Sequence, residues 1–273
     1  MSAIASPNAS VRVAVAGGIA RVTVDRPDAM NTINEDVAAA LHQVFAAIAE
    51  APDVRAVVLE GAGKHFMAGG DVKAFHGKIS SEPDRTGRRH YFEGLLNTIH
   101  RAVSAMRAAP QPVVAKVRGA VAGGGIGVML ACDLVVASDD AVFNLAYCHL
   151  GTSPDCGTTY QLPRVAGMKR AMELALLGER FDAEQAERWG LVNRVMPAAE
   201  LDGAVDALAA RLAAGPARAY AHTKALLNRS LGGRLAEHLD AEARGFAECS
   251  TTDDFAEGVD AFVAKRKPEF TGT

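Results

Sequence analysis

Apolar and polar residues alternate in two short segments near the start of the chain. Val11-Arg-Val-Ala-Val15 and Ala20-Arg-Val-Thr-Val24 follow the two-residue period of half-buried strands, and Gly17-Gly18 lies between them. Paired glycines suit the positive-φ turn that joins antiparallel strands. The pattern therefore predicts a β-hairpin at the start of the fold.

The period then changes from two residues to about 3.6. Arg26-Pro27 ends the second strand because proline cannot donate to a strand ladder, and Asn34 is a good N-cap for a helix that runs to about Glu50. Val37, Leu41 and Phe45 recur on one face of this helix. The first unit is therefore expected to be strand, strand, helix.

The next hundred residues repeat this order. A buried strand is expected over 54–59, and a helix over 89–107 that Pro110 and Pro112 stop. Residues 73–89 mix charged, Ser and Gly residues, which predicts a mobile surface loop that can act as a lid. A third unit follows from another apolar strand, the glycine run 123–125 and a helix, and it closes with strands over 133–137 and 141–143.

Helical patterns dominate the later part of the chain. Two short helices are expected around Gly167, another is capped by Asp182, and almost everything from Pro197 onward is helical. Strands early and helices late predict a layered α/β core over residues 1–196 and a helical region over 197–273. No linker separates them, so they are expected to form one functional unit.

Composition narrows the class of protein. The chain has 273 residues, 49% of them hydrophobic, and a formal net charge of -3, which argues against a nucleic-acid surface. The N-terminal residues lack the pattern of a signal peptide, and no apolar run is long enough to span a membrane. Cys132, Cys148, Cys156 and Cys249 have no C-x-x-C spacing, so we expect reduced thiols in the cytoplasm, with no disulfide and no metal.

Two glycine-rich loops follow buried strands. Residues 119–127 contain neither a dinucleotide fingerprint nor a Walker lysine, so a nucleotide-phosphate loop is not expected. Phe66-Met-Ala-Gly-Gly-Asp71 is the second such loop. If the N–H groups of Gly70 and Gly124 point at one spot, they form an oxyanion hole. The alternative is two unrelated turns that allow close packing.

Eight short segments, spread over nearly the whole chain, form one set of motifs. They are Arg26-Pro-Asp-Ala-Met-Asn31, Phe66-Met-Ala-Gly-Gly-Asp71, Gly119-Ala-Val-Ala-Gly-Gly-Gly125, Cys132-Asp133, Leu150-Gly-Thr-Ser-Pro154, Leu162-Pro-Arg164, Gly190-Leu-Val192 and Glu257-Gly-Val-Asp-Ala-Phe-Val-Ala-Lys-Arg266. Taken together, these motifs resemble the crotonase (enoyl-CoA hydratase/isomerase) superfamily, in particular the isomerases that have a single carboxylate.

The resemblance implies a crotonase-like spiral of strand, strand, helix units with a helical trimerisation region. It also implies a homotrimer or a dimer of trimers, and an acyl-CoA thioester as ligand, with coenzyme A as part of the substrate and no prosthetic group. The N–H groups of Gly70 and Gly124 are expected to hold the thioester oxygen. The residues expected to contact the substrate are Arg26, Ala29, Ala68, Asp71, Tyr147, Phe262 and Lys265, the last two reaching the coenzyme A of the same or a neighbouring subunit.

Departures from the family pattern bear on the reaction. Hydratases of this superfamily have two catalytic glutamates, and this chain has Gly127 and Tyr147 at those positions. Asp155 matches the single carboxylate of double-bond isomerases, including those that act on epoxyphenylacetyl-CoA. One carboxylate can remove a proton at one carbon and return it two carbons away. The alternative to a catalytic role is a structural one, in which Asp155 is the N-cap of the helix that follows.

Three other functions stay open. Enoyl-CoA hydration is one, although both hydratase carboxylates are missing. A second is the hydrolytic dehalogenation of 4-halobenzoyl-CoA, in which Asp155 is the nucleophile and His100 activates water. The third is a coenzyme A-binding protein without activity. His65 and His149 lie near the motifs and are assigned no role, and the acyl group that binds is not predicted.

Overall fold

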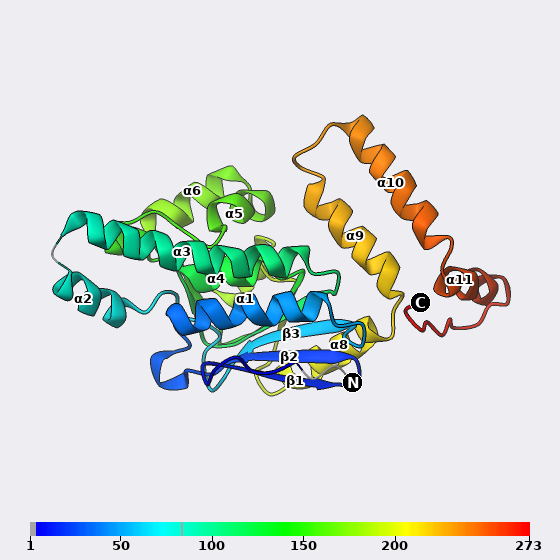
Figure 1. Ribbon diagram of the computed structural model, residues 1–273, viewed down its shortest axis with the longest axis horizontal. Helices are drawn as coiled ribbons and strands as arrows, with labels where there is room; N and C mark the ends of the chain where they lie inside the picture. Colours follow the sequence, from blue (N-terminus) through cyan, green and yellow to red (C-terminus); the bar gives the residue numbers. More distant parts are fainter. Residues whose placement is uncertain (1–3, 83) are drawn as a thin grey trace.

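A six-stranded sheet forms the centre of the computed structural model, which describes residues 4–82 and 84–273 (Figure 1). Its strand order is β1-β2-β3-β4-β6-β9, with β1 antiparallel to β2 and all other neighbours parallel. The strands are β1 (Val11–Ala16), β2 (Ile19–Val24), β3 (Ala56–Gly61), β4 (Val113–Val117), β6 (Leu134–Ser138) and β9 (Arg194–Met196).

The first unit confirms the predicted hairpin and helix. β1 and β2 pair from Val11↔Val24 to Ala16↔Ile19, and Gly17 and Gly18 make the turn at φ +58° and +76°. The one-turn helix η1 (Pro27–Ala29) follows, and then α1 (Glu35–Ala49) begins. The Asn34 side chain accepts a hydrogen bond from the N–H of Val37 at 3.0 Å, as expected of the N-cap.

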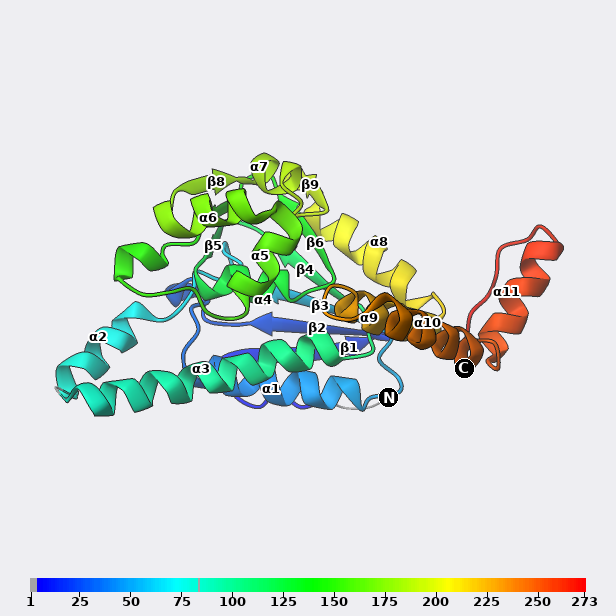
Figure 2. The same cartoon turned by 90° about the horizontal axis from the view of Figure 1, so that it is seen from above.

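Helices cover both faces of the sheet. α1 and α3 (Arg85–Ala108) pack together on one face, where they bury the main core (Figure 2). On the other face, Val58, Val114 and Val136 of β3, β4 and β6 pack against α8 (Leu201–Ala213). Burial on both faces explains why these parallel strands are continuous apolar runs rather than alternating ones.

The predicted surface loop over 73–89 is wrong. The segment forms α2 (Val72–Ser81) and the first turn of α3, apart from a short connection in which residue 83 lies outside the described residues. Asp71 accepts from the N–H of Ala74 at 3.1 Å, and Asp84 accepts from that of Gly87 at 2.8 Å. These two N-caps start helices in a segment whose composition is typical of a loop. The role of a lid stays a prediction.

A three-stranded sheet and several short helices form the second layer. The sheet order is β5-β7-β8, with β5 (Ala120–Ala122), β7 (Val142–Asn144) and β8 (Arg180–Asp182). The short β5 strand, inside the glycine motif, was not expected. The helices are α4 (Gly124–Leu130), the one-turn η2 (Tyr147–Leu150), α5 (Thr158–Ala166), α6 (Met168–Leu177) and α7 (Ala183–Arg188), with Asp182 capping α7 as predicted.

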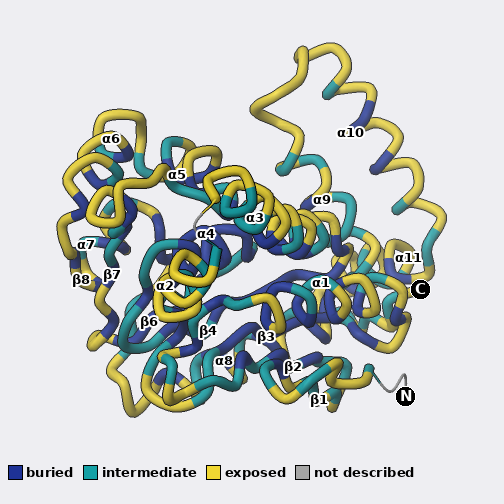
Figure 3. Tube along the Cα trace, turned by 60° about the vertical axis from the view of Figure 1, so that its left-hand side comes forward, coloured by how far each residue is buried: buried dark blue, intermediate teal, exposed yellow. Residues whose placement is uncertain are grey.

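Three helices at the C-terminal end project from the core as an arm, α9 (Ala217–Arg229), α10 (Leu235–Cys249) and α11 (Asp253–Val263) (Figures 1 and 3). The helical region predicted from residue 197 therefore has two parts, because α8 packs on the sheet while α9–α11 extend away from it. Within the described residues, no helix combines the length and the apolar character needed to cross a membrane.

Candidate active site

The two glycine loops lie backbone against backbone. Met67 forms a bridge with Val121, and the N–H of Ala122 donates to the carbonyl of Met67 at 3.0 Å. Gly69 has φ +87°, and a Cβ there would lie 2.9 Å from the carbonyl oxygen of Ala122. Only glycine allows this approach, so the loops are neighbours in one site rather than two unrelated turns.

Two amide groups of these loops are available to a ligand. Gly124 is the first residue of α4, so its N–H has no acceptor within the helix. Around Gly70, Ile33 donates to the carbonyl of Gly69 at 2.7 Å and accepts from Asp71 at 3.0 Å. In the part of the chain that the structure describes, neither the Gly70 nor the Gly124 N–H makes a protein hydrogen bond. Both can therefore donate to a bound oxygen.

Asp155 lies beside this glycine helix. A Cβ on Gly124 would be 3.2 Å from Oδ1 of Asp155, and the same oxygen accepts a hydrogen bond from the Tyr147 hydroxyl at 2.6 Å. α5 begins at Thr158, and its N-cap is Gly157, with no side-chain capping bond. The interpretation of Asp155 as an N-cap is therefore wrong, because the carboxylate faces Tyr147 and not the start of the helix.

Both neighbours of this carboxylate stay protonated. Burial raises the pKa of Tyr147 well above its ordinary value, and the charge of Asp155 and the hydrogen bond to it raise this pKa further. Burial, followed by the charge of Asp155 and a hydrogen bond to it, also raises the pKa of the Cys156 thiol. Cys156 is therefore a poor nucleophile, and Tyr147 is a hydrogen-bond donor rather than a base.

Gly127 has no room for a side chain. A Cβ there would lie 2.6 Å from the Cβ of Cys156 and 2.7 Å from its carbonyl oxygen. The chain entering α5 fills this space, so a carboxylate cannot be placed at this position without moving the backbone. The close packing of Cys156, the residue after Asp155, against Gly127 therefore excludes a glutamate at position 127.

His100 reaches the same turn from α3. Its Nε2 accepts a hydrogen bond from the N–H of Cys156 at 3.3 Å, while the residue itself is exposed. The structure therefore brings His100 to the residue next to Asp155, a contact across 56 positions of the sequence. It does not join the His100 and Asp155 side chains by a hydrogen bond in the described residues.

The predicted substrate-contact residues of the first 71 positions come together where two loops meet. Arg26 donates to Asp71 Oδ2 at 2.8 Å and to the carbonyl of Thr32 at 2.7 Å. Burial raises the pKa of Asp71, but the Arg26 hydrogen bond and the Ala74 N–H outweigh it and hold this pKa below its ordinary value. Asp71 is therefore ionised at neutral pH. Ala29 is the last residue of η1, three positions after Arg26 in the sequence.

Asn31 organises this loop and was not singled out from the sequence. It is fully buried at φ +56°, and its amide donates to the carbonyls of Ala62 and His65 at 2.9 and 2.7 Å. The N–H of Ala68 donates to the neighbouring Met30 carbonyl at 3.0 Å, which ties the two loops together. An asparagine four residues after Pro27 was the available signal, because asparagine tolerates the left-handed region.

The Phe75 side chain of α2 packs on Gly70, and Phe92 of α3 packs on Phe75. A Cβ on Gly70 would lie 2.6 Å from the Cζ of Phe75, and the Phe75 and Phe92 rings meet edge to face at 5.1 Å. Sequence reasoning missed Phe75 because the segment that contains it had been interpreted as a loop. Phe262 and Lys265 lie at the end of α11 on the arm, away from the other predicted residues (Figure 1).

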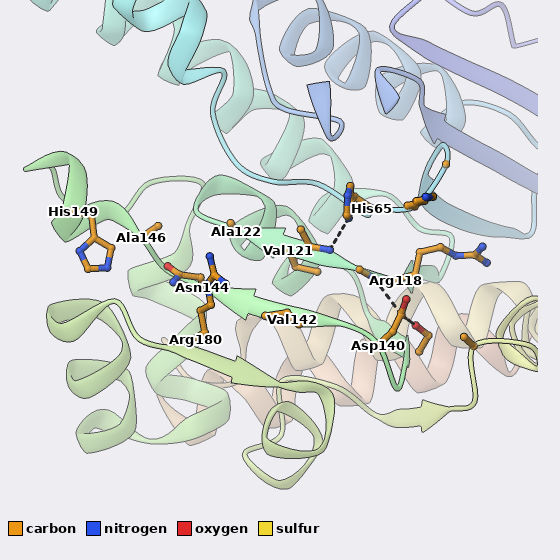
Figure 4. A pocket seen from close by; sticks show the side chains of 16 residues that line it. His65, Arg118, Val121, Ala122, Asp140, Val142, Asn144, Ala146, His149 and Arg180 are labelled. Atoms are coloured by element: carbon orange, nitrogen blue, oxygen red, sulfur yellow. Dashed lines mark hydrogen bonds between the residues drawn. The ribbon is translucent and has the colours of Figure 1, made fainter. Parts of the chain in front are cut away.

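A cavity of about 810 Å³ lies over β5 and β7. Figure 4 shows His65, Asn144, His149 and Arg180 around it, and neither Asp155 nor the glycine amides line it. His65 has a structural contact here, since its Nδ1 accepts from the N–H of Ala120 at 3.0 Å. Among the described residues, no group of three or more His, Cys, Asp or Glu residues could hold a metal ion.

The fold and the site therefore define an α/β protein in which two glycine loops are in contact and the partly buried carboxylate of Asp155 lies beside Gly124. A family model described as Enoyl-CoA hydratase/isomerase matches residues 14–273. The chain belongs to the enoyl-CoA hydratase/isomerase family, and it is an enzyme of that superfamily.

Individual relatives differ in the reaction that their names give. The chain is 39% identical over 264 residues to a "Probable enoyl-CoA hydratase" of Rhodobacter capsulatus, covering 96% of this chain and 98% of that protein. It is 35% identical over 255 residues to the 1,2-epoxyphenylacetyl-CoA isomerase of Escherichia coli, covering 93% and 95%. The crystal structure of an enoyl-CoA hydratase from Polaromonas sp. JS666 matches with a TM-score of 0.88 at 31% identity, covering 95% and 98%.

Proposed function

We propose that this protein is an enoyl-CoA isomerase in which Asp155 carries the proton. The observation that supports this most strongly is the position of Asp155, whose Oδ1 lies 3.2 Å from where a Cβ of Gly124 would be. A carboxylate beside an unpaired amide suits a reaction in which a thioester oxygen gains charge while a nearby C–H loses its proton. Acyl-CoA thioesters are the substrates that the names of its relatives give.

The proposed reaction uses no group besides those of the chain and the substrate. The Asp155 carboxylate removes a proton from C2 of a 3-enoyl-CoA, and the electron pair of that C–H bond forms a dienolate whose charge rests on the thioester oxygen. The N–H groups of Gly70 and Gly124 donate to this oxygen. The proton on Asp155 then goes to C4, which leaves the double bond between C2 and C3 and restores the carboxylate.

The amide donors and the carboxylate are expected to contribute to the rate by similar factors. Removing one oxyanion-hole donor costs enzymes about 2.7–4 kcal/mol in barrier height. General acid–base catalysis by one positioned group contributes about 10²- to 10⁴-fold in rate. Both are needed for isomerisation, and Gly70, Gly124 and Asp155 are the residues proposed to supply them.

Hydration is the less favoured reaction despite the name of the Rhodobacter capsulatus relative. Addition of water needs a base that activates the water and an acid that protonates C2. Gly127 has no space for a side chain, and Tyr147 donates its hydroxyl proton to Asp155 as a hydrogen bond. Neither of these two positions therefore supplies the second acid or base that hydration needs beside Asp155.

Dehalogenation of a 4-halobenzoyl-CoA is the second candidate, and the position of His100 favours it. In this reaction Asp155 attacks the aryl carbon and displaces halide, and His100 activates the water that hydrolyses the aryl ester. His100 lies within 3.3 Å of the Cys156 N–H, directly after Asp155. Its Nε2 is used in that contact, which leaves only Nδ1 for a water.

Coenzyme A is proposed to bind where the loop with Arg26 and Ala29 meets the loop with Ala68 and Asp71, next to the Gly70 amide. A homotrimer, or a dimer of trimers, is proposed as the assembly. The apolar side chains on the arm support it, because each of the following is at least 52% exposed in the single chain: Leu227, Leu231, Leu235, Leu239, Phe246, Phe262 and Val263. Phe262 and Lys265 would then reach the coenzyme A of a neighbouring subunit.

The test is a comparison of three thioesters with the wild-type protein. A 3-enoyl-CoA, a 2-enoyl-CoA and a 4-halobenzoyl-CoA are mixed with excess enzyme, and the products of a single turnover are separated. We expect the 3-enoyl-CoA to become the 2-enoyl-CoA faster than either other substrate reacts. Faster hydration of the 2-enoyl-CoA, faster halide release, or no reaction of any thioester that binds would each contradict the isomerase function.

A further inference from the structure

Tyr147 makes a short hydrogen bond to the Asp155 side chain. It is 6% exposed, and its hydroxyl donates to one carboxylate oxygen, Oδ1, at 2.6 Å. A charge-assisted O–H···O hydrogen bond of this length is strong and holds its acceptor in one orientation. A carboxylate without such a bond can rotate and exchange its two oxygens.

The backbone next to Tyr147 and Asp155 also has a restricted conformation. Ala146, before Tyr147, and Cys156, after Asp155, both have positive φ, at 40° and 52°. Residues other than glycine keep this conformation only where their surroundings fix it. Here the N–H of Thr158 donates to the carbonyl of Asp155 at 2.9 Å, and that of Cys156 donates to His100 at 3.3 Å. The side chains of Tyr147 and Asp155 therefore extend from backbone whose conformation is fixed.

We propose that Tyr147 is a positioning residue that holds Oδ1 of Asp155, so that Oδ2 alone carries the proton from C2 to C4 of the acyl chain. This inference rests on the isomerase function proposed above. The lone pair of Oδ2 takes the C2 proton, and the same oxygen gives it to C4 as the dienolate electrons form the new C–H bond. Tyr147 keeps its own proton throughout.

If Oδ2 keeps the proton that it removes from C2, the same proton is delivered to C4 of the same substrate molecule. In the absence of Tyr147 the carboxylic acid can turn, and its proton can exchange with water before it reaches C4. The fraction of turnovers in which the C2 proton reaches C4 is therefore a property that would not depend on Tyr147 if its role were merely structural.

The experiment uses a 3-enoyl-CoA with two deuterium atoms at C2, in ordinary water, and mass spectrometry of the product to locate deuterium at C4. Wild-type protein is expected to return a measurable fraction of the deuterium. Tyr147→Phe is expected to lower that fraction at least two-fold and kcat at least about ten-fold, with KM changed less than two-fold. Tyr160→Phe is the matched control, because Tyr160 is exposed on α5 and stacks on Arg164.

Each outcome decides the question. The deuterium fraction is counted per product molecule, so it does not depend on how much of a variant is folded. Wild-type protein that returns no deuterium, or Tyr147→Phe that returns as much as wild type, overturns the positioning role. Asp155→Asn separates the two proposals: if it isomerises as fast as wild type, the proposed function itself fails, whereas its loss of activity together with an unchanged Tyr147→Phe contradicts only the role of Tyr147.

Discussion

The turn around Asp155 and the arm α9–α11 differ in how far their side chains find partners within the same chain. Around Asp155, the Tyr147 hydroxyl, the His100 ring and the backbone amides have partners within the same chain. On the arm, Leu235, Leu239 and Phe246 are 73, 52 and 69% exposed, and the tube in Figure 3 is mostly yellow there.

The difference separates two physical tasks. A proton carrier must be held in one orientation before the substrate arrives, so the site is built from hydrogen-bonded groups. An arm with exposed leucines gains its stability only when another surface covers them. The core is therefore expected to be stable by itself, and the arm is expected to be stable as part of an assembly.

The largest expected effect is at the place where the arm is anchored to the core. Lys224 is buried on α9, and its Nζ lies 2.8 Å from Asp133 and donates to the carbonyls of Met106 and Gln111 at 3.0 Å. Lys224→Met leaves the partly buried Asp133 without its ion-pair partner, although the Val113 N–H still donates to it, and should lower the free energy of unfolding by about 3–5 kcal/mol. Urea unfolding at pH 7 measures this loss.

The same variant gives a pH dependence with a definite sign. Burial raises the pKa of Asp133, and Lys224 opposes that rise, so its removal raises the pKa further. A folded-state carboxyl pKa above the unfolded value means that stability falls as pH rises. The deficit of Lys224→Met should thus shrink as pH falls below 7, and Asp133→Asn in the same chain should recover part of it. A pH-independent loss under about 1 kcal/mol would contradict the anchoring role.

A smaller effect is expected inside the core at Gly127. Gly127→Ala places a methyl group 2.6 Å from the Cβ of Cys156 and should destabilise the protein by about 1–3 kcal/mol. Gly77→Ala is the matched control, because Gly77 lies in α2 with no atom within 4 Å of its Cβ position, and the change should stabilise the helix by up to about 1 kcal/mol. Equal melting temperatures for the two variants would show that position 127 has room for a side chain.

The smallest change in subunit stability is expected on the arm. Leu235→Gln with Leu239→Gln removes exposed apolar surface and should alter the unfolding free energy of the single subunit by no more than about 0.5 kcal/mol. If the proposed trimer forms through this face, sedimentation should nevertheless show a shift from trimer toward monomer at micromolar concentration. An unchanged mass would mean that this face of α10 is not an assembly surface.

Elements that depend on residues close together in the sequence could be predicted. The Gly17-Gly18 hairpin, the Asn34 cap and the Asp182 cap each require a contact within a few residues, and all three are confirmed. β5 could not be predicted, because its three residues lie inside a glycine motif and pair with β7. The α2 segment was misinterpreted because its caps, rather than an apolar face, start the helix.

The site could be predicted only in part. The resemblance pointed to Gly70, Gly124 and Asp155, and the structure places Gly124 and Asp155 side by side. The hydrogen bond from Tyr147 could not be predicted, because the chain between these residues reverses through η2 and a left-handed glycine at 151. The lack of space at Gly127 depends on the entry of α5, a contact that periodicity does not encode.

The most direct test of the central claim is the single-turnover rate of Asp155→Asn with a 3-enoyl-CoA. Asparagine keeps the shape of the side chain and its contact with Tyr147, but it cannot take a proton. The rate of isomerisation should fall by about 10²- to 10⁴-fold, while the shift in melting temperature on adding the thioester stays that of wild type. A rate within about ten-fold of wild type would contradict the assignment of Asp155 as the proton carrier.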